Sequence, residues 1–347
     1  MRRVSNEHTS KRLTMKEAML FQIRPSVICA ITFLLGASLV GCNQPFDPRG
    51  PLYSQVTIFS VLSTDRNDQF VRVERTYMPT DFDALAYTAD NFVPNALVTI
   101  QGTDSTFTLR DTTIARPDMS RYKFSIRAYF AKPLVINYGA SYHVTVRSPQ
   151  FENASTAIVV PAKPVVVMTP LSSQILQFPR PETDKTEIVF TIDLGGGAKG
   201  WIGRLFVYYN VLKDGKWVEE RAPVPIYFIF PKVFTSVVYR ELTRAGYKNR
   251  SASVYLNNMY ARTINQVAYE KYPSSKITFT RAVFELVQVE ENLYNYYEVA
   301  HGNNDPHSVR LDEPLYTNLV GGVGVVGAYT LDSLVQILPD NFIANRQ

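Results

Sequence analysis

The stretch "GGVGVVGAY" (residues 321–329) places Gly322, Gly324 and Gly327 in the order G-x-G-x-x-G, which is the spacing of a dinucleotide-binding loop. Such a loop requires a helix that opens on the phosphates and an acidic residue about 20 positions further on. Here the glycines lead into "AYTLDSLVQILP", which alternates like a strand, and only 20 residues follow Gly327. We therefore expect no nucleotide cofactor. We expect the glycines to give the backbone a tight path, through a positive φ or a bulge, into a closing strand.

Working outward, residues 52–161 contain a series of short segments in which apolar and polar residues alternate, as in half-buried strands. In "ASYHVTVRS" (140–148), for example, Tyr142, Val144 and Val146 alternate with polar residues, including His143, which we expect to be exposed. Polar turns separate the segments. This pattern predicts an immunoglobulin-like β-sandwich. The other predicted strands cover residues 53–63, 69–77, 96–102, 105–112, 121–127 and 155–162.

A proline-rich stretch, residues 162–185, is predicted to be a linker or a crossing segment. Residues 186–340 are predicted to form a larger β-rich (α+β) domain with short helical insertions, so that the whole protein is mainly β. Asp214-Gly215 is a strong hairpin signal between segments 204–213 and 216–224, and the first of these is apolar on both faces, as in a central strand. Further strands are predicted at 187–194 and 276–289, helices at 239–247, 261–272 and 290–302, and a tail at 341–347.

The N-terminus has the organisation of an export signal. Six basic residues precede the apolar run "VICAITFLLGASLV" (27–40), which is shorter than the roughly 20 residues needed to span a bilayer. Leu39, Val40 and Gly41 then precede Cys42, in a pattern that resembles the bacterial lipobox, in which the cysteine is lipidated. We expect residues 1–41 to be a lipoprotein signal peptide and residues 42–51 a tether. An ordinary signal with an incidental Cys42 is the alternative. Because the charged region is long, Met15 and Met19 are alternative start positions to Met1.

Charge and cysteine content exclude several function classes. The formal net charge of +5 falls to +1 when residues 1–41 are removed, so it does not indicate nucleic-acid binding. The two cysteines are Cys29 in the signal and Cys42. The exported part therefore has no thiol left for a disulfide, a zinc site or a nucleophile.

Segments along the whole exported chain show a family resemblance. "EENLYNYYEVAHGNNDPHSVRLDEPLYTNLVGGVGVVGAY" (290–329) resembles the C-terminal signature of a large family of Bacteroidota lipoproteins that carries the label domain of unknown function. The segments "VLSTDRNDQFVRVERTY", "VPNALVTI", "YGASYHVTV" and "AIVVPAKP" resemble its N-terminal strands. The similarity runs from about residue 55 to residue 338, with Val325-Val326 in place of a common aromatic residue. Genes of this family often lie beside TonB-dependent outer-membrane receptors. The resemblance therefore implies an outer-membrane location and a receptor as partner, and it implies no catalytic residues.

Three sets of residues could carry chemistry or binding. "HGNNDPH" places His301, Asp305 and His307 in one loop, but the spacing matches no standard zinc pattern, so we predict no metal site. Tyrosines and tryptophans near residues 201–217 and 294–297 are either core or a ligand platform. The apolar run "PIYFIFPKVF" (225–234) is either a buried strand or a docking surface for a partner. For docking, the candidate residues are Tyr227, Phe228, Ile229 and Phe230.

The sequence therefore predicts an outer-membrane-anchored lipoprotein with no enzymatic activity, which acts as a ligand-binding or accessory protein beside a TonB-dependent receptor. The ligand and the face of the outer membrane are open. One alternative is a hydrolase of glycans or peptides at the cell surface, although no motif selects a pair of carboxylates among the many Asp and Glu residues. The other alternative is a structural envelope protein or adhesin, because fold alone does not separate these functions.

Overall fold

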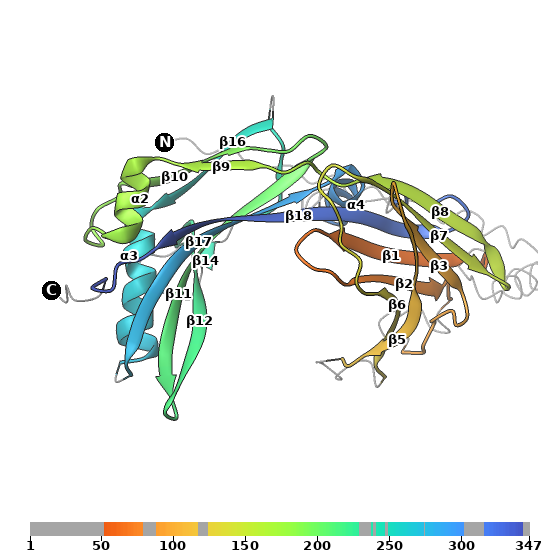
Figure 1. Cartoon of the computed structure of the whole chain (residues 1–347), viewed down its shortest axis with the longest axis horizontal. Coiled ribbons are helices and arrows are strands. Elements are labelled where there is room, and N and C mark those ends of the chain that lie inside the picture. Colours follow the sequence, from red (N-terminus) through yellow and green to blue (C-terminus); the bar gives the residue numbers. More distant parts are fainter. Residues whose placement is uncertain are drawn as a thin grey trace, which may run out of the picture. The chain divides into compact units, whose positions relative to one another are not determined.

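The computed structural model describes residues 52–78, 88–116, 124–228, 237–238, 241–246, 249–273, 275–301 and 316–342. These residues belong to one compact unit that begins at Leu52. The protein is mainly β, with several sheets and short helices, as the sequence predicts (Figure 1). The predicted signal, the tether and Cys42 lie outside the described residues, as does part of the predicted tail. No helix of the described part of the chain is long and apolar enough to cross a membrane.

The largest sheet has nine strands and draws on both halves of the chain. Its order is β12-β11-β17-β18-β1-β2-β6-β5, with β15 paired to β11. The bounds of these strands are β1 Val56–Ser63, β2 Gln69–Arg75, β5 Arg110–Ile114, β6 Ile126–Ala131, β11 Gly200–Lys213, β12 Lys216–Val224, β15 Thr243–Arg244, β17 Ile277–Val289 and β18 Val323–Ile337. The predicted strand at 121–127 therefore begins later, at Ile126. The sheet crosses the predicted boundary at residues 162–185, so its strands belong to both halves.

Strand β18, which carries two of the three glycines, joins the halves. Its first half pairs in parallel with β1, from Thr57↔Val323 to Ser63↔Tyr329. Its second half pairs antiparallel with β17, from Tyr329 to Ile337. Figure 1 shows β18 in dark blue running from β1 to β17. The predicted closing strand is therefore confirmed, and it lies inside the sheet and not at its edge.

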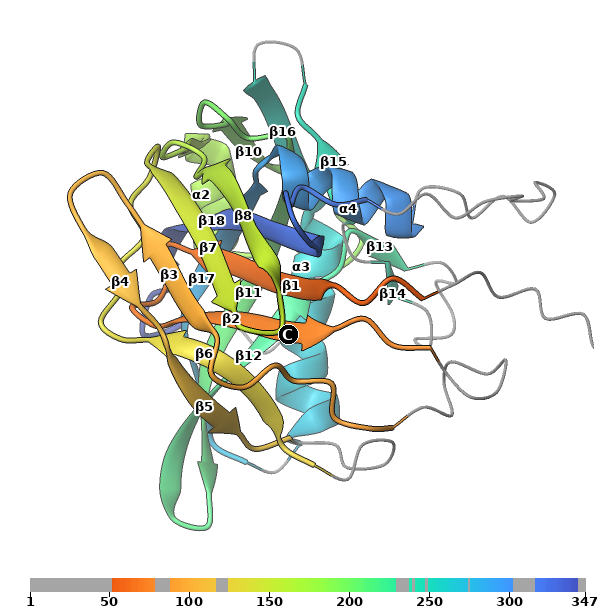
Figure 2. The same ribbon diagram turned by 90° about the vertical axis from the view of Figure 1, so that its right-hand side faces the viewer.

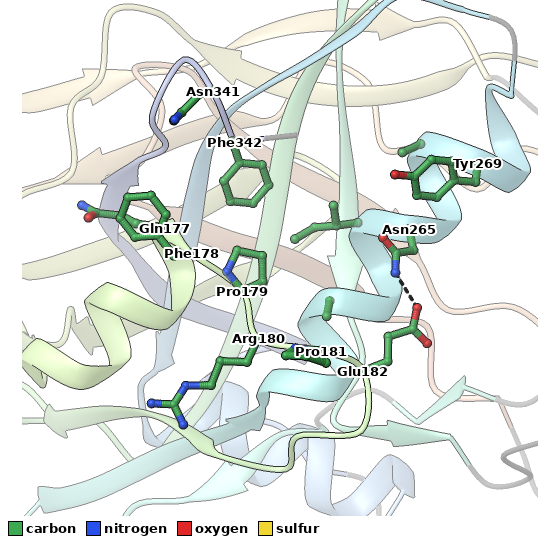
Figure 3. Close-up of a pocket in the computed structure, with 13 residues that line it drawn as sticks. Gln177, Phe178, Pro179, Arg180, Pro181, Glu182, Asn265, Tyr269, Asn341 and Phe342 are labelled. Atoms are coloured by element: carbon green, nitrogen blue, oxygen red, sulfur yellow. Dashed lines mark hydrogen bonds between the residues drawn. The ribbon is translucent and has the colours of Figure 1, made fainter. Parts of the chain in front are cut away.

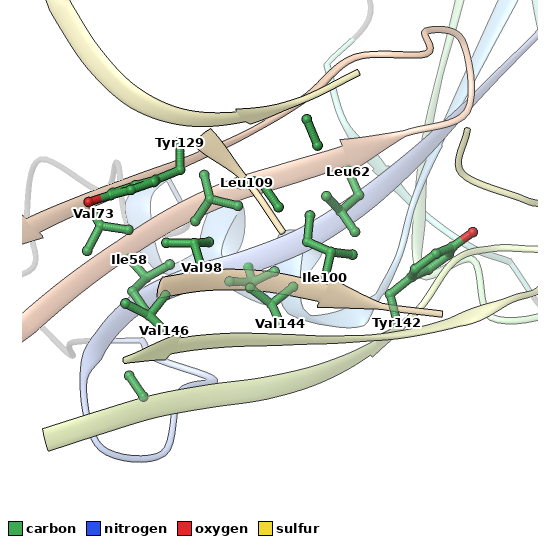
Figure 4. Close-up of a cluster of buried hydrophobic side chains, with 14 of the residues drawn as sticks. Ile58, Leu62, Val73, Val98, Ile100, Leu109, Tyr129, Tyr142, Val144 and Val146 are labelled. Carbon is green, nitrogen blue, oxygen red and sulfur yellow. The ribbon is translucent and has the colours of Figure 1, made fainter. Parts of the chain in front are cut away.

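The first half is a sandwich of two sheets. The second sheet has the order β4-β3-β7-β8 and turns its face toward the viewer in Figure 2. Its strands are β3 Leu97–Gln101, β4 Thr106–Thr108, β7 Ser141–Ser148 and β8 Phe151–Val159. The alternation in β7 is confirmed, because Tyr142, Val144 and Val146 are buried and His143 is exposed. The three buried side chains of β7 and Ile58 of β1 belong to one hydrophobic cluster. Figure 4 shows this core.

The second half packs a small sheet and two helices against β11 and β17. The small sheet has the order β16-β10-β9, with β9 Val165–Met168, β10 Glu187–Asp193 and β16 Arg250–Leu256. The helices are α2 Pro170–Gln177 and α3 Asn257–Asn265, and α3 continues as the π-helix η2 Gln266–Lys271. In the core between them, the rings of Phe190 and Phe284 stack with 4.1 Å between their centroids. The stretch 162–185 is thus an ordered crossing segment, because it contains β9 and α2.

Of the two glycines in β18, Gly324 confirms the predicted positive φ, and Gly327 instead makes room for a helix. Gly324 has φ +114°, and a Cβ placed there would lie 2.2 Å from the carbonyl oxygen of Ile58 on β1. A Cβ on Gly327 would lie 2.7 Å from Cβ of Leu293, because helix α4 (Glu291–His301) packs over this point. Both positions therefore need a residue without a side chain.

Helix α4 confirms the helix predicted at 290–302. Buried Glu290 caps it, because its two carboxylate oxygens accept the backbone N–H groups of Asn292 at 2.6 Å and Leu293 at 2.7 Å. Burial raises the pKa of Glu290 above its ordinary value. Among the tyrosines of residues 294–297, Tyr294 is buried in the core and Tyr296 is 40% exposed.

The helix predicted at 239–247 is wrong for the described residues 241–246. Thr243 and Arg244 instead form the short strand β15, which pairs with Trp201 and Gly200 of β11. Backbone hydrogen bonds to the start of β11 outweigh the local helical propensity of this segment. A local sequence pattern does not reveal such a distant partner.

Candidate ligand-binding groove

A groove with a volume of about 640 Å³ lies between the loop that follows α2 and the helix pair α3–η2. This volume is within the usual range for ligand sites. One wall is the loop, the other is α3–η2, and the C-terminal turn closes one end (Figure 3). The lining residues are Gln177, Phe178, Pro179, Arg180, Pro181, Glu182, Ala261, Ile264, Asn265, Ala268, Tyr269, Asn341 and Phe342.

The loop wall begins where α2 ends. Thr169 caps the start of α2 by accepting the N–H of Ser172 at 3.2 Å, and Pro170 occupies the first helical position. The helix stops at Phe178, whose N–H donates to the carbonyl of Gln174 at 2.8 Å while its backbone turns away (φ −137°). This change of direction leaves the Phe178 side chain 55% exposed at the groove.

One buried side chain of α3 holds the loop wall. Asn257 accepts the N–H of Arg180 at 2.9 Å. Its amide nitrogen donates to the carbonyls of Arg180 at 3.1 Å, Pro181 at 3.1 Å and Asp184 at 3.2 Å. Asn257 is completely buried, and hydrogen bonds in such surroundings are strong and costly to lose. A loop with two prolines is thereby fixed to a rigid helix.

Two further contacts hold the same wall. The hydroxyl of buried Tyr260 donates to the carbonyl of Leu176 at 2.8 Å, and burial raises the pKa of this hydroxyl. Within the loop, Asp184 accepts the N–H of Thr186 at 2.7 Å and a guanidinium N–H of Arg180 at 3.3 Å. Hydrogen bonds from the side chain and backbone of Thr186 hold the pKa of Asp184 below its usual value. The wall is therefore formed before any ligand arrives.

The opposite wall contains the change from α-helix to π-helix at Gln266. Single π-turns inside helices occur often at functional sites. Here the wider turn buries Val267 and Ala268, and it leaves Tyr269 43% exposed beside the groove. Ile264 and Ala261 are buried about one and two turns earlier, and both line the groove as apolar residues.

The two charged side chains that line the groove are both paired. Glu182 accepts the amide N–H of Asn265 at 2.5 Å and contacts Arg262 at 3.4 Å. Arg180 pairs with Asp184 at 3.3 Å. The lining residues include one carboxylate and no His, Cys, Ser, Thr or Lys. This set suits the binding of a neutral ligand and lacks a nucleophile with its base.

A second polar cluster, around Glu220 of β12, is closed on itself. Glu220 accepts hydrogen bonds from Tyr272 at 2.7 Å, Tyr209 at 2.9 Å and Lys271 at 3.0 Å, and it pairs with Lys213. Hydrogen bonds from Lys213, Tyr272 and Lys271 lower the pKa of Glu220. Its partners occupy both carboxylate oxygens, so the cluster offers no free acceptor to a ligand. Because the partners lie on β11 and at the end of η2, the cluster holds the β11–β12 hairpin against η2. Across the described residues, no group of three His, Cys, Asp or Glu side chains could hold a metal ion.

The candidate residues taken from the sequence are only partly described. Tyr227 and Phe228 form strand β13, which pairs with β14 Val237–Val238, but their side chains lie outside the described residues. Ile229 and Phe230 also lie outside, as do Leu39, Val40, Gly41, Cys42, Asp305 and His307. The aromatic residues near the hairpin divide: Trp201 and Tyr209 are core, and Trp217 is 55% exposed.

Sequence reasoning missed the lining residues Phe178, Asn265 and Tyr269, and it also missed Asn257, which holds the loop wall. Only the segment "FPRP" (178–181) carried a local signal, because two prolines beside an aromatic residue mark an irregular surface segment. Known proteins add no assignment, since no family model and no curated protein matches this chain.

Proposed function

We propose that this protein is an exported lipoprotein, anchored to the outer membrane through Cys42, whose β-rich body binds a ligand without transforming it. In this proposal it serves as an accessory protein beside a TonB-dependent receptor. The observation that carries the binding role is the preformed groove, in which the charged side chains are paired and no nucleophile–base arrangement is present among the lining residues.

The anchor rests on the sequence before the compact unit. The apolar run 27–40 and the lipobox-like Leu39-Val40-Gly41-Cys42 precede residues 43–51, "NQPFDPRGP", which are polar and proline-rich. Acyl chains on Cys42 contribute about 0.8 kcal/mol for each buried CH₂ group, and more than one chain holds a protein stably on a membrane. Such a tether would keep the β-rich body at the membrane surface.

The anchor predicts that a fatty-acid label depends on one cysteine. We expect cells grown with an alkynyl palmitate to label the wild-type protein and the Cys29→Ser variant, and we expect the Cys42→Ser variant to lose the label. The Cys29→Ser variant is the matched control, because these are the two cysteines of the chain. The readout is gel fluorescence after reaction of the alkyne, with the protein level measured by blotting. A label that survives Cys42→Ser would contradict the anchor.

The binding role is tested separately from the anchor. The purified lipoprotein is incubated with glycan and peptide libraries, and the products are analysed by mass spectrometry. The proposal expects the components to be recovered unchanged. Turnover that a single carboxylate substitution abolishes would instead assign the protein to the hydrolases.

A further inference from the structure

We propose that the groove binds a neutral oligosaccharide, with pyranose rings stacked on Phe178 and Tyr269 and hydroxyl groups hydrogen-bonded to Glu182 and Asn265. This inference names the ligand class and rests on the proposed binding role. It does not depend on the lipid anchor.

The stacking surfaces are two exposed rings from different walls. Phe178 stands on the loop after α2 and is 55% exposed, and Tyr269 stands on η2 and is 43% exposed. Figure 3 shows both rings beside the groove, with Pro179 between them in this view. Exposing large aromatic side chains costs hydrophobic free energy unless a ligand covers them. The axial C–H groups of a pyranose form an apolar face that fits an aromatic ring.

The charge of the groove selects a neutral ligand. Arg180 is held by Asp184, and Glu182 is held by Asn265 and Arg262. A charged ligand would have to break one of these pairs or leave its own charge unpaired, and both are costly in a partly desolvated groove. The remaining polar side chains of the lining are neutral: the amides of Gln177, Asn265 and Asn341 and the hydroxyl of Tyr269.

The hydrogen-bonding groups favour a sugar over a peptide. Pro179 and Pro181 have no N–H, so the loop wall cannot add a peptide strand through a regular backbone ladder. A proline-rich peptide would stack on aromatic residues, but its proline backbone offers only acceptors. Such a ligand would cover the carboxylate of Glu182, which Asn265 and Arg262 hold, without adding a donor in place of the water it displaces. A sugar hydroxyl both donates and accepts, so it satisfies a carboxylate and an amide together.

The groove is built for selective binding because its walls do not have to be ordered by the ligand. The contacts of Asn257 fix the loop wall to α3, and Tyr260 fixes the end of α2 from which the loop departs. Preorganisation of this kind reduces the entropy lost on binding.

The test measures binding by the full-length lipoprotein in a zwitterionic detergent, because detergents with sugar headgroups would compete. The probes are maltotriose, cellotriose, xylotriose and mannotriose, with a decaproline peptide and a trigalacturonate for comparison. Saturation-transfer NMR detects binding, and titration gives the Kd. We expect at least one neutral trisaccharide to bind. We also expect Phe178→Ala and Tyr269→Ala each to weaken that binding by about tenfold, the size of one lost aromatic contact.

Three variants separate a stacking role from a structural one. Trp217→Ala is the matched control, because Trp217 is 55% exposed and lies outside the groove lining. It should leave the Kd unchanged. Phe178→Trp keeps a ring and should retain binding, and Tyr269→Ala on the other wall covers the case in which Phe178→Ala disturbs the end of α2.

The results that overturn the inference are distinct from those that overturn the proposed function. No saturable binding of any neutral trisaccharide, or equal binding by the wild type and both alanine variants, rejects a sugar site here. Binding of decaproline alone, or of trigalacturonate alone, rejects the ligand class and leaves the binding role standing. Cleavage of a bound trisaccharide would confirm the sugar site and reject the non-enzymatic role.

Discussion

Replacing Gly324 by alanine should lower the free energy of unfolding by at least about 3 kcal/mol. The residue has φ +114°, a conformation that side chains rarely allow, and the new Cβ would lie 2.2 Å from the carbonyl oxygen of Ile58. The backbone of β18 fixes the position of the Cβ, and the oxygen belongs to the backbone of the paired strand β1, so neither atom can move alone. The substitution therefore separates the parallel pair that joins the two halves of the protein.

Two other glycines provide matched controls for this prediction. Gly215→Ala combines a positive φ of +77° with open space, so it should cost only about 1 kcal/mol. Gly196→Ala has neither problem and should change stability by less than about 0.5 kcal/mol. Stability is measured by urea unfolding, with the fluorescence of buried Trp201 as the signal. Equal effects of the three substitutions would contradict the role given to β18.

Replacing Asn257 by alanine should cost about 3 kcal/mol of stability and should also weaken ligand binding. The change leaves the N–H of Arg180 without its acceptor, and it removes the two amide N–H groups that three loop carbonyls share. The loss affects the loop wall of the groove directly. Urea unfolding measures the first effect, and trisaccharide titration measures the second.

The neighbouring residue supplies the control. Asn258 lies on the same helix, and its buried side-chain oxygen has no hydrogen-bond partner among the described residues. Asn258→Ala should therefore change stability by about 0.5 kcal/mol or less. An equal loss of stability in both variants would show that α3 tolerates no alanine here. The hydrogen bonds of Asn257 to the loop would then have no special role.

Local patterns in the sequence predicted much of the fold. The hairpin at Asp214-Gly215 formed with φ +49° and +77°, as an Asp-Gly turn requires. The alternation of β7 and the helix at 290–302 were also readable, because each depends on residues close in sequence. The helix at 239–247 failed because pairing with β11 outweighed local propensity.

The pairing of β1 with β18 and the groove could not be predicted, because both depend on contacts between distant segments. Val323 pairs with Thr57 across more than two hundred residues, and no local signal specifies a parallel partner. The side chain of Asn257 accepts the N–H of Arg180, which lies 77 positions earlier in the chain. The Asn257-Asn258 pair at the start of a helix carries no sign of such a role. Phe178 and Tyr269 likewise form one site only after the chain has folded.

The most direct test of a preformed binding groove is amide hydrogen exchange of the ligand-free protein, read by mass spectrometry on peptides that cover residues 178–186. The account predicts slow exchange, because the amides of Phe178, Arg180, Asp184 and Thr186 all donate hydrogen bonds within the protein. It also predicts that Asn257→Ala speeds exchange in this segment, while Asn258→Ala leaves it unchanged. Exchange in the wild type as fast as that of an unstructured peptide would contradict the account, because the groove would then have no fixed wall to offer a ligand.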